Sequence, residues 1–237
     1  MNPSQTDSDI QFDSNFESGN LDEVVQLSKT EFDLYMRVDT NTRGHLQWFF
    51  FSIAYGQSYQ NQSITFHINN FTKPGALYSN GMRVCVARRS LNYEWRREGD
   101  KISYSKSKCP RRHDLDRYFN GLTFTYDLGK EPTDQIYFAY CLPYTFSKLT
   151  NFLRQLRDVA RAQDCLKETT LCKSLSGLPV PLLTVTSRLS SPDYHKIDLE
   201  EFTSLQSRVS VPMRTSKQYA VVAARVHPGE TPSSFMM

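Results

Sequence analysis

The chain has 237 residues, of which 39% are hydrophobic and 13% aromatic, and its formal net charge is only +3. This length suffices for one large domain or one and a half ordinary domains, and the aromatic content argues against general disorder. The small net charge argues against a strongly basic nucleic-acid-binding protein. The longest apolar run, residues 48–55, is far too short to span a bilayer.

The first twenty residues lack the basic and apolar regions of a secretory signal. Five cysteines occur in the chain, and none forms a Cys-x-x-Cys pair. Without a secretory signal, an odd set of this kind indicates reduced thiols in a cytosolic protein.

Charge is distributed unevenly along the chain. Residues 1–33 carry eight acidic side chains against one basic, and residues 88–117 carry ten basic against five acidic. We expect residues 1–10 to be a disordered acidic leader. The plain interpretation of the basic segment is a solvated loop, and the alternative is a basic face that binds an acidic polymer or protein tail. The candidate substrate-binding residues of that face are Arg96, Arg97, Arg111 and Arg112.

From residue 11 to residue 143, short apolar runs alternate with turn residues, which predicts an N-terminal antiparallel β-sandwich domain. In residues 122–128 the apolar side chains recur at every second position, so they should share one buried face. The run at residues 44–56 is almost continuously apolar and predicts a strand buried on both faces. The predicted strands lie within 31–39, 44–56, 63–71, 82–89, 101–107, 122–128 and 134–144.

The character of the sequence changes near residue 143. Thr145 is a residue type that caps helix N-termini, and apolar residues then recur at helical spacing. The spacing predicts an amphipathic helix. Its apolar stripe comprises Phe146, Leu149, Phe152, Leu153, Leu156 and Val159.

Three further segments follow this helix. Residues 181–187 predict a strand, residues 188–216 predict a long polar loop, and residues 217–226 predict a strand buried on both faces of an α/β sheet. The simplest interpretation of the loop is a plain insertion. Residues 144–237 are therefore expected to be the start of an α/β domain that is incomplete. The chain is thus mainly β.

His227 and Glu230 directly follow the last predicted strand, in the order His-Pro-Gly-Glu. An imidazole and a carboxylate are both zinc ligands, and Pro228 and Gly229 favour a turn that would bring them to one ion. The next two residues, Thr-Pro, are typical of a helix start. Ligand sites in open α/β sheets lie at the carboxyl ends of strands, where His227 stands. The alternative is a surface histidine beside a helix-capping acid, because His-x-x-Glu is a weak motif by itself.

The other four histidines give no preferred third ligand. His45 precedes a predicted strand and His67 lies within one, which is typical of a structural histidine. His113 lies in the basic segment and His195 in the polar loop.

At this point the residues resemble a known family. Residues 225–235 resemble the zinc-ligand segment of the M14 metallocarboxypeptidases, in particular of the cytosolic carboxypeptidases, and are closest to their sixth vertebrate type. The likeness covers residues 12–187 and 218–235. Segments that resemble the family's N-terminal domain and domain junction are 12–21, 31–40, 70–73, 77–82, 94–104 and 137–145.

The resemblance implies a zinc-dependent carboxypeptidase that removes C-terminal or side-chain glutamates from tubulin and other acidic tails. It implies a cytoplasmic location, with microtubule or cilium association, and it makes His227 and Glu230 the first two zinc ligands. The family's second histidine ligand, its carboxylate-binding residues and its general base cannot be matched here. No catalytic residue is therefore assigned, Arg225 receives no role, and the chain alone is expected to be inactive. Whether it is a fragment or a short isoform stays open.

The alternative function is a non-catalytic β-sandwich module. Such a module would bind acidic tails or a partner protein through the basic segment without cutting them.

Overall fold

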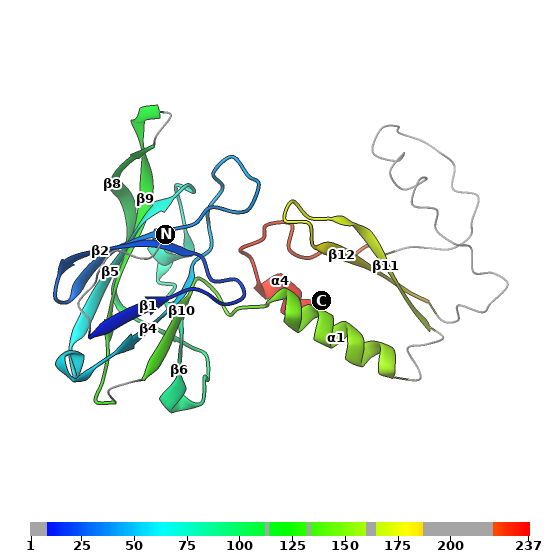
Figure 1. Cartoon of the computed structure of the whole chain (residues 1–237). Coiled ribbons are helices and arrows are strands. Elements are labelled where there is room, and N and C mark those ends of the chain that lie inside the picture. Colours follow the sequence, from blue (N-terminus) through cyan, green and yellow to red (C-terminus); the bar gives the residue numbers. More distant parts are fainter. Residues whose placement is uncertain (1–8, 112–113, 132–133, 160–164, 187–219) are drawn as a thin grey trace. The chain divides into compact units, whose positions relative to one another are not determined.

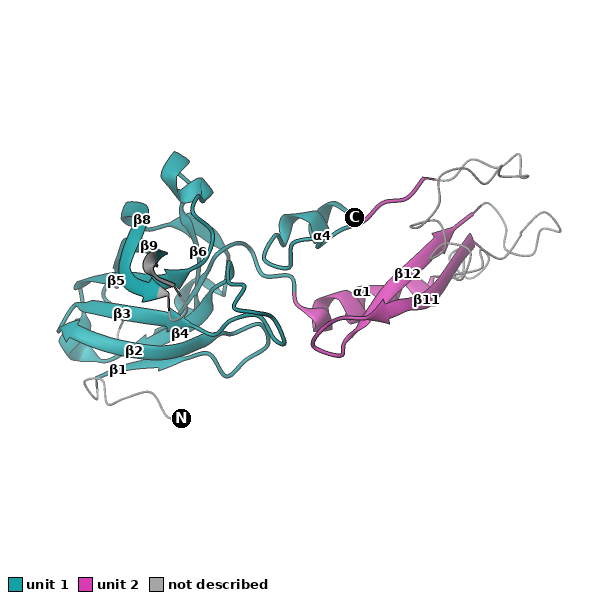
Figure 2. Ribbon diagram, turned by 90° about the horizontal axis from the view of Figure 1, so that it is seen from above, with its two compact units in different colours: residues 1–144, 224–237 teal, residues 145–223 magenta. Residues whose placement is uncertain are grey.

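The computed structural model of the chain describes residues 9–111, 114–131, 134–159, 165–186 and 220–237 (Figure 1). These fall into two compact units (Figure 2). The first, called the sandwich unit below, comprises residues 1–144 and 224–237, and the second unit comprises residues 145–223. The first boundary lies next to the position where the sequence changes character. The final segment, in contrast, clusters with the sandwich unit rather than with the second unit.

The sandwich unit is built from two five-stranded sheets. Its strands are β1 (Ile10–Asp13), β2 (Leu21–Ser28), β3 (Glu31–Met36), β4 (Phe50–Tyr55), β5 (Ser63–Phe71), β6 (Val84–Arg88), β7 (Arg96–Glu98), β8 (Asp100–Arg111), β9 (Asp114–Asp127) and β10 (Gln135–Ala139). The sheet orders are β1-β4-β10-β6-β7 and β2-β3-β5-β9-β8. Short 3-10 helices are η1 (Gln57–Tyr59), η2 (Leu77–Asn80) and η3 (Arg89–Leu91).

Most of these strands pair antiparallel, as predicted, but β3 and β5 pair in parallel. The reason lies in the connection. The chain leaves β3, contributes β4 to the other sheet, and returns to the first sheet as β5. A parallel pair requires such a crossover, whereas an antiparallel pair can be joined by a hairpin.

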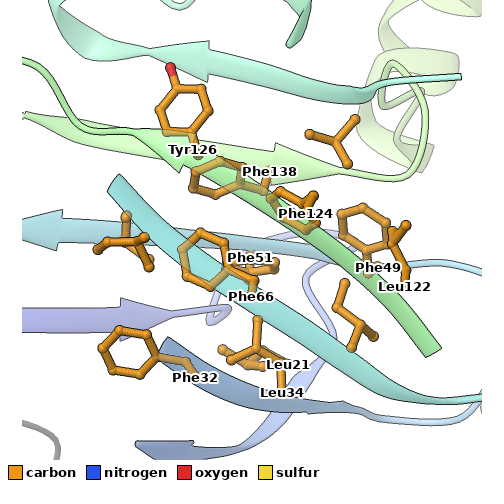
Figure 3. Packing of buried hydrophobic residues seen from close by; sticks show 14 of the residues in the cluster. Leu21, Phe32, Leu34, Phe49, Phe51, Phe66, Leu122, Phe124, Tyr126 and Phe138 are labelled. Atoms are coloured by element: carbon orange, nitrogen blue, oxygen red, sulfur yellow. The ribbon is translucent and has the colours of Figure 1, made fainter. Parts of the chain in front are cut away.

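Aromatic side chains fill the space between the sheets (Figure 3). Phe51 of β4 stacks on Phe138 of β10 with ring centroids 5.3 Å apart, and Phe66 of β5 lies 5.2 Å from Phe124 of β9. Phe66 and Phe138, which belong to opposite sheets, are 5.3 Å apart. All four are fully buried. The two inner faces therefore interdigitate, as the cores of sandwiches do.

Two strand predictions are confirmed at the level of single side chains. Leu122, Phe124, Tyr126 and Leu128 are all buried on one side of the β9 segment. Strand β4 is buried on both faces, as its continuous apolar run predicted.

The expectation of a disordered leader over residues 1–10 is wrong at its last two residues. The Asp9 carboxylate accepts a hydrogen bond from the Ser58 amide at 2.9 Å. Ile10 begins β1, pairs with Tyr55 of β4, and is only 1% exposed. Pairing with a buried strand outweighs the acidic surroundings of this residue in the sequence. Residues 1–8 lie outside the described part of the chain.

The second unit contains helix α1 (Phe146–Asp158) and a hairpin of β11 (Leu166–Lys173) and β12 (Pro179–Val185). The predicted cap is confirmed, because the Thr145 hydroxyl accepts a hydrogen bond from the Lys148 amide at 3.2 Å. Of the predicted apolar stripe, Leu153 is buried, whereas Phe152 and Val159 are exposed. Strand β12 was predicted and β11 was not.

The predicted strand at residues 217–226 is wrong over its described part. Residues 220–225 have no regular secondary structure, and Val221 and Val222 are 74% and 69% exposed. A strand buried on both faces needs neighbours that complete its hydrogen bonds, and no described strand pairs with this segment. The predicted loop at residues 188–216 lies outside the described residues. Among the helices that are described, none is long and apolar enough to cross a membrane.

Candidate metal-ligand turn

His227 and Glu230 lie in one tight turn of the sandwich unit, which we call the ligand turn (residues 227–230). The Glu230 amide donates a hydrogen bond to the His227 carbonyl oxygen at 3.0 Å. This bond closes the turn across Pro228 and Gly229, as the sequence predicted. Both ligand-type residues are exposed, so a metal ion has access to their side chains.

Gly229 was expected to supply unusual backbone dihedral angles in the turn, but it serves instead as a small residue at a packing contact. Its backbone does not adopt the left-handed conformation, which the structure instead assigns to Arg225, with a φ of 60°. Gly229 is buried, and a Cβ atom at this position would lie 3.7 Å from Gln47 and 3.8 Å from Trp48. The glycine therefore seats the turn against the segment that precedes β4, at ordinary contact distance.

Arg225 has no role predicted from the sequence, yet it makes most of the side-chain hydrogen bonds around the turn. Its Nε and Nη2 atoms donate to the Pro228 carbonyl oxygen at 2.9 and 2.6 Å. Its Nη1 atom donates to the Tyr144 carbonyl oxygen at 3.1 Å. Burial lowers the pKa of the Arg225 guanidinium. A weaker bond runs from Nη1 to the Ser234 hydroxyl at 3.4 Å. No pattern in a single sequence marks Arg225, because its shorter hydrogen bonds go to backbone carbonyls, one of them far away along the chain.

Helix α4 (Pro232–Met236) follows the turn, with a proline in its first turn as predicted. Thr231 also occupies the N-cap position, as expected. The Thr231 hydroxyl makes no capping bond, and it is 1% exposed with no hydrogen-bond partner among the described residues. The Ser233 hydroxyl of α4 instead contacts residues before the helix: its Oγ accepts from the Arg225 amide at 3.1 Å and donates to the Glu230 carbonyl at 2.8 Å.

The donor types of the ligand turn fit a zinc ion, but the described residues do not complete the set. No group of three His, Cys, Asp or Glu side chains that could hold a metal occurs in this part of the chain. His67 is structural, as predicted: its ring nitrogens lie 2.8 Å from the Thr123 hydroxyl and 2.9 Å from a Glu31 carboxylate oxygen. His45 is exposed in the loop before β4. His113 and His195 lie outside the described residues.

Of the four candidate arginines of the basic segment, the structure describes the side-chain contacts of Arg96 and Arg97. Arg96 is exposed on β7 and contacts the Glu94 carboxylate at 2.6 Å. Arg97 donates to the Arg83 and Tyr140 carbonyl oxygens at 2.6 and 3.3 Å. Its guanidinium is therefore engaged by the fold.

The remaining two candidates follow in the sequence. Arg111 is the last residue of β8, and Arg112 lies outside the described residues. Three lysines of the basic segment, which are not among the candidate arginines, are exposed on β8: Lys101, Lys106 and Lys108.

Comparison with known proteins bears on this arrangement. The N-terminal domain of cytosolic carboxypeptidases matches residues 12–140. The chain is 35% identical over 237 residues to cytosolic carboxypeptidase 3 of Mus musculus, which covers 98% of this chain. The chain belongs to the cytosolic carboxypeptidase family. This family member is also 34% identical to cytosolic carboxypeptidase 2 of Xenopus tropicalis, over 98% of its length, and 32% identical to cytosolic carboxypeptidase 1 of Mus musculus, over 96%.

The cytosolic carboxypeptidase chain spans about a fifth of the length of these curated relatives, namely 21%, 22% and 18%. Solved structures share its fold. A metallo-carboxypeptidase from Burkholderia cenocepacia superposes with a TM-score of 0.51 at 19% identity, covering 77% of this chain and 42% of that one. A metallo-carboxypeptidase from Pseudomonas aeruginosa gives 0.50 at 18% identity, covering 76% and 41%. The closer relation to the sixth vertebrate type stays a prediction.

Proposed function

We propose that this cytosolic carboxypeptidase chain supplies His227 and Glu230 as two ligands of a zinc ion. The site would belong to a carboxypeptidase that removes glutamates from the acidic tails of tubulin and other proteins, in the cytoplasm and at microtubules or cilia. The observation that carries the proposal is the hydrogen-bonded turn that places an imidazole and a carboxylate three residues apart, both exposed. Membership in the family supports it.

The chemistry divides between the ion and the chain. A bound zinc ion supplies Lewis acidity and activates water. The chain's own part is to hold the His227 imidazole and the Glu230 carboxylate on one short turn. Hydrolysis also needs a group that accepts a proton, and the described residues offer no assigned general base. We therefore propose that the 237-residue chain does not release glutamate by itself.

Zinc binding tests the ligand assignment. The affinity of the chain for Zn²⁺ would be measured in competition with a chromogenic chelator. We expect His227→Ala and Glu230→Gln each to lower that affinity by about tenfold or more, because each removes one ligand. His45→Ala, which removes another exposed histidine, should leave it unchanged. Equal affinities of the chain and His227→Ala would rule out this site.

A second assay separates ligation from turnover. The chain and Zn²⁺ would be incubated with a polyglutamylated peptide, and released glutamate would be measured. We expect no release. Release that disappears in His227→Ala would overturn the proposed inactivity while supporting the ligand assignment.

A non-catalytic module for acidic tails is the second candidate, and the exposed lysines of β8 favour it. We expect reversal of Lys106 and Lys108 to glutamate, together with Arg96, to weaken binding of a glutamate-rich peptide by roughly tenfold, since charges at a binding surface steer acidic partners. Lys173→Glu on β11 is the matched control. Unchanged binding in the triple variant would remove this candidate. Reversal of Arg111 and Arg112 extends the test to the rest of the predicted basic face.

A further inference from the structure

We propose that Arg225 is a positioning residue for zinc binding, which acts through the Pro228 carbonyl to hold the ligand turn on the sandwich unit. The inference rests on the proposed metal ligation by His227 and Glu230. It concerns a residue that touches neither the ion nor a substrate.

The first step is the grip on the turn. Two N–H groups of the Arg225 guanidinium, Nε and Nη2, converge on the carbonyl oxygen of Pro228. This carbonyl belongs to the peptide between the two ligand residues, so fixing it restricts the backbone on both sides. Hydrogen bonds from a charged donor are shorter and stronger than neutral ones, and the planar guanidinium also imposes a direction.

The second step is the anchor on the sandwich unit. The third nitrogen of the same guanidinium, Nη1, donates to the carbonyl oxygen of Tyr144 at 3.1 Å. The Tyr144 ring in turn packs edge-on against Phe235 of α4, with centroids 4.9 Å apart. One side chain therefore connects the ligand turn to the last residue of the sandwich unit's first segment.

The third step is the seat beneath the turn. Gly229 packs against Gln47 and Trp48, and both side chains are themselves fixed. Gln47 donates to the Tyr140 hydroxyl at 3.3 Å, and the Trp48 indole N–H donates to the Ser18 carbonyl at 2.9 Å. Arg225 thus holds the turn against a preorganised surface, as the outer-shell partners of metal ligands do.

A direct role for Arg225 in binding a substrate carboxylate fits these contacts less well. Its three side-chain nitrogens are already hydrogen-bonded to the Pro228 and Tyr144 carbonyls. A positive charge beside the turn would also oppose a divalent cation rather than attract it. In this proposal Arg225 acts through the arrangement of its hydrogen-bond donors and not through its positive charge. Substitution by lysine, which keeps the charge, separates the two properties.

The first readout needs no metal. The amide of Glu230, which closes the turn, would be followed by hydrogen exchange in the 237-residue chain. We expect Arg225→Gln and Arg225→Lys each to speed the exchange of this amide by about tenfold or more. Neither side chain has the planar guanidinium whose two N–H groups hold the Pro228 carbonyl, and lysine tests this separately from charge because it keeps the positive charge. The thermal midpoint of the sandwich should hardly change, since Arg225 lies outside both sheets. Unchanged exchange in both variants would overturn the proposal.

The second readout is Zn²⁺ affinity, with the His227 imidazole followed by nitrogen NMR. Removing an outer-shell partner typically costs about 10- to 100-fold in metal affinity, which is the loss expected for Arg225→Gln and Arg225→Lys. Arg37→Lys is the matched control, because it makes the same substitution at an exposed arginine that pairs with Asp22 and lies outside the ligand turn. If Arg225→Lys bound Zn²⁺ with wild-type affinity, the paired hydrogen bonds from the guanidinium to Pro228 would not be required.

The outcomes distinguish the two proposals. If His227→Ala does not lower zinc affinity, the proposed ligation fails, and hydrogen exchange alone decides whether Arg225 holds the turn. If His227→Ala lowers the affinity and neither Arg225 variant does, ligation stands and the positioning role is wrong.

Discussion

Arg88 and Asp134 form an ion pair inside the sandwich unit: Arg88 Nε donates to Asp134 Oδ2 at 2.9 Å, and the Asp134 side chain is 1% exposed. Ser90 donates to the same carboxylate through its amide at 3.0 Å and its hydroxyl at 2.6 Å. Arg88 also donates to the Leu128 carbonyl at 2.6 Å. This network joins the end of β6 to the residue that precedes β10.

Loss of the Asp134 carboxylate should destabilise the fold. We expect Asp134→Ala to lower the free energy of unfolding by about 3–5 kcal/mol, because the Arg88 charge would remain buried without its partner. Urea denaturation at neutral pH measures this. Asp22→Ala is the control, since its ion pair with Arg37 is largely exposed and should contribute little. Equal losses in the two variants would contradict the assignment.

The same pair makes stability depend on pH. Burial alone would raise the pKa of the Asp134 carboxyl, but the hydrogen bonds from Ser90 and Arg88 outweigh it and lower this pKa below its ordinary value of 3.8. The carboxylate therefore stabilises the fold above pH 3.8, and that contribution is lost as the pH falls through the lowered pKa. We expect the stability difference between the chain and Asp134→Asn to shrink below about pH 4. A difference that stays constant down to pH 2 would be inconsistent with this.

Phe66 is the side chain whose loss should damage the core most directly, because it contacts rings of both sheets. We expect Phe66→Ala to cost about 3–5 kcal/mol of unfolding free energy, through lost burial and the cavity that remains. Leu27→Ala is the comparison, since Leu27 is 52% exposed on β2. A loss below about 1 kcal/mol for Phe66→Ala would mean that the two inner faces pack less closely than the ring distances indicate.

Arg96 and Arg97 are neighbours with different expected effects. Arg97→Ala would remove the guanidinium donor from the Arg83 carbonyl, whereas the Tyr140 carbonyl would keep its hydrogen bond from the Tyr78 hydroxyl. The loss should cost about 1–3 kcal/mol of stability. Arg96→Ala should leave stability almost unchanged, since its contact with Glu94 is exposed. Thermal unfolding of the two variants measures the contrast. If both unfold like the parent chain, the structural role of Arg97 is wrong.

The five free cysteines should differ in reactivity. Burial raises the pKa of the Cys85 thiol to about 11, so little of the reactive thiolate exists near pH 8. Cys172 on β11 is exposed. We expect iodoacetamide at pH 8 to modify Cys172 well before Cys85, as followed by peptide mass spectrometry. The contrast should vanish in urea, and fast labelling of Cys85 in the native chain would contradict its burial.

Local patterns were enough for the elements whose conformation depends on near neighbours. The period of two in residues 122–128 predicted a buried face, and Thr145 predicted the start of α1. The Pro-Gly pair predicted the ligand turn. Each of these depends on backbone and side-chain preferences within a few residues, which a single sequence contains.

Long-range pairing explains the failures. Strand β2 has only Leu21 and Val24 buried, so its pattern is weak and its partner β3 defines it. In residues 217–226 the apolar pattern is strong, but the predicted strand does not form over the described part. An apolar run indicates burial without indicating which strand would pair with it. Arg225 was overlooked since its anchor, the Tyr144 carbonyl, is 81 positions away.

The ligand turn docks on residues that precede the second unit in the chain, including Gln47, Trp48 and Tyr144. Domains generally fold in order during synthesis, beginning with the N-terminal one. The residues that contact the turn are therefore synthesised before the turn itself, and the synthesis of residues 145–223 lies between the two. The two proposed zinc ligands would thus be placed by a surface that is already folded when they emerge.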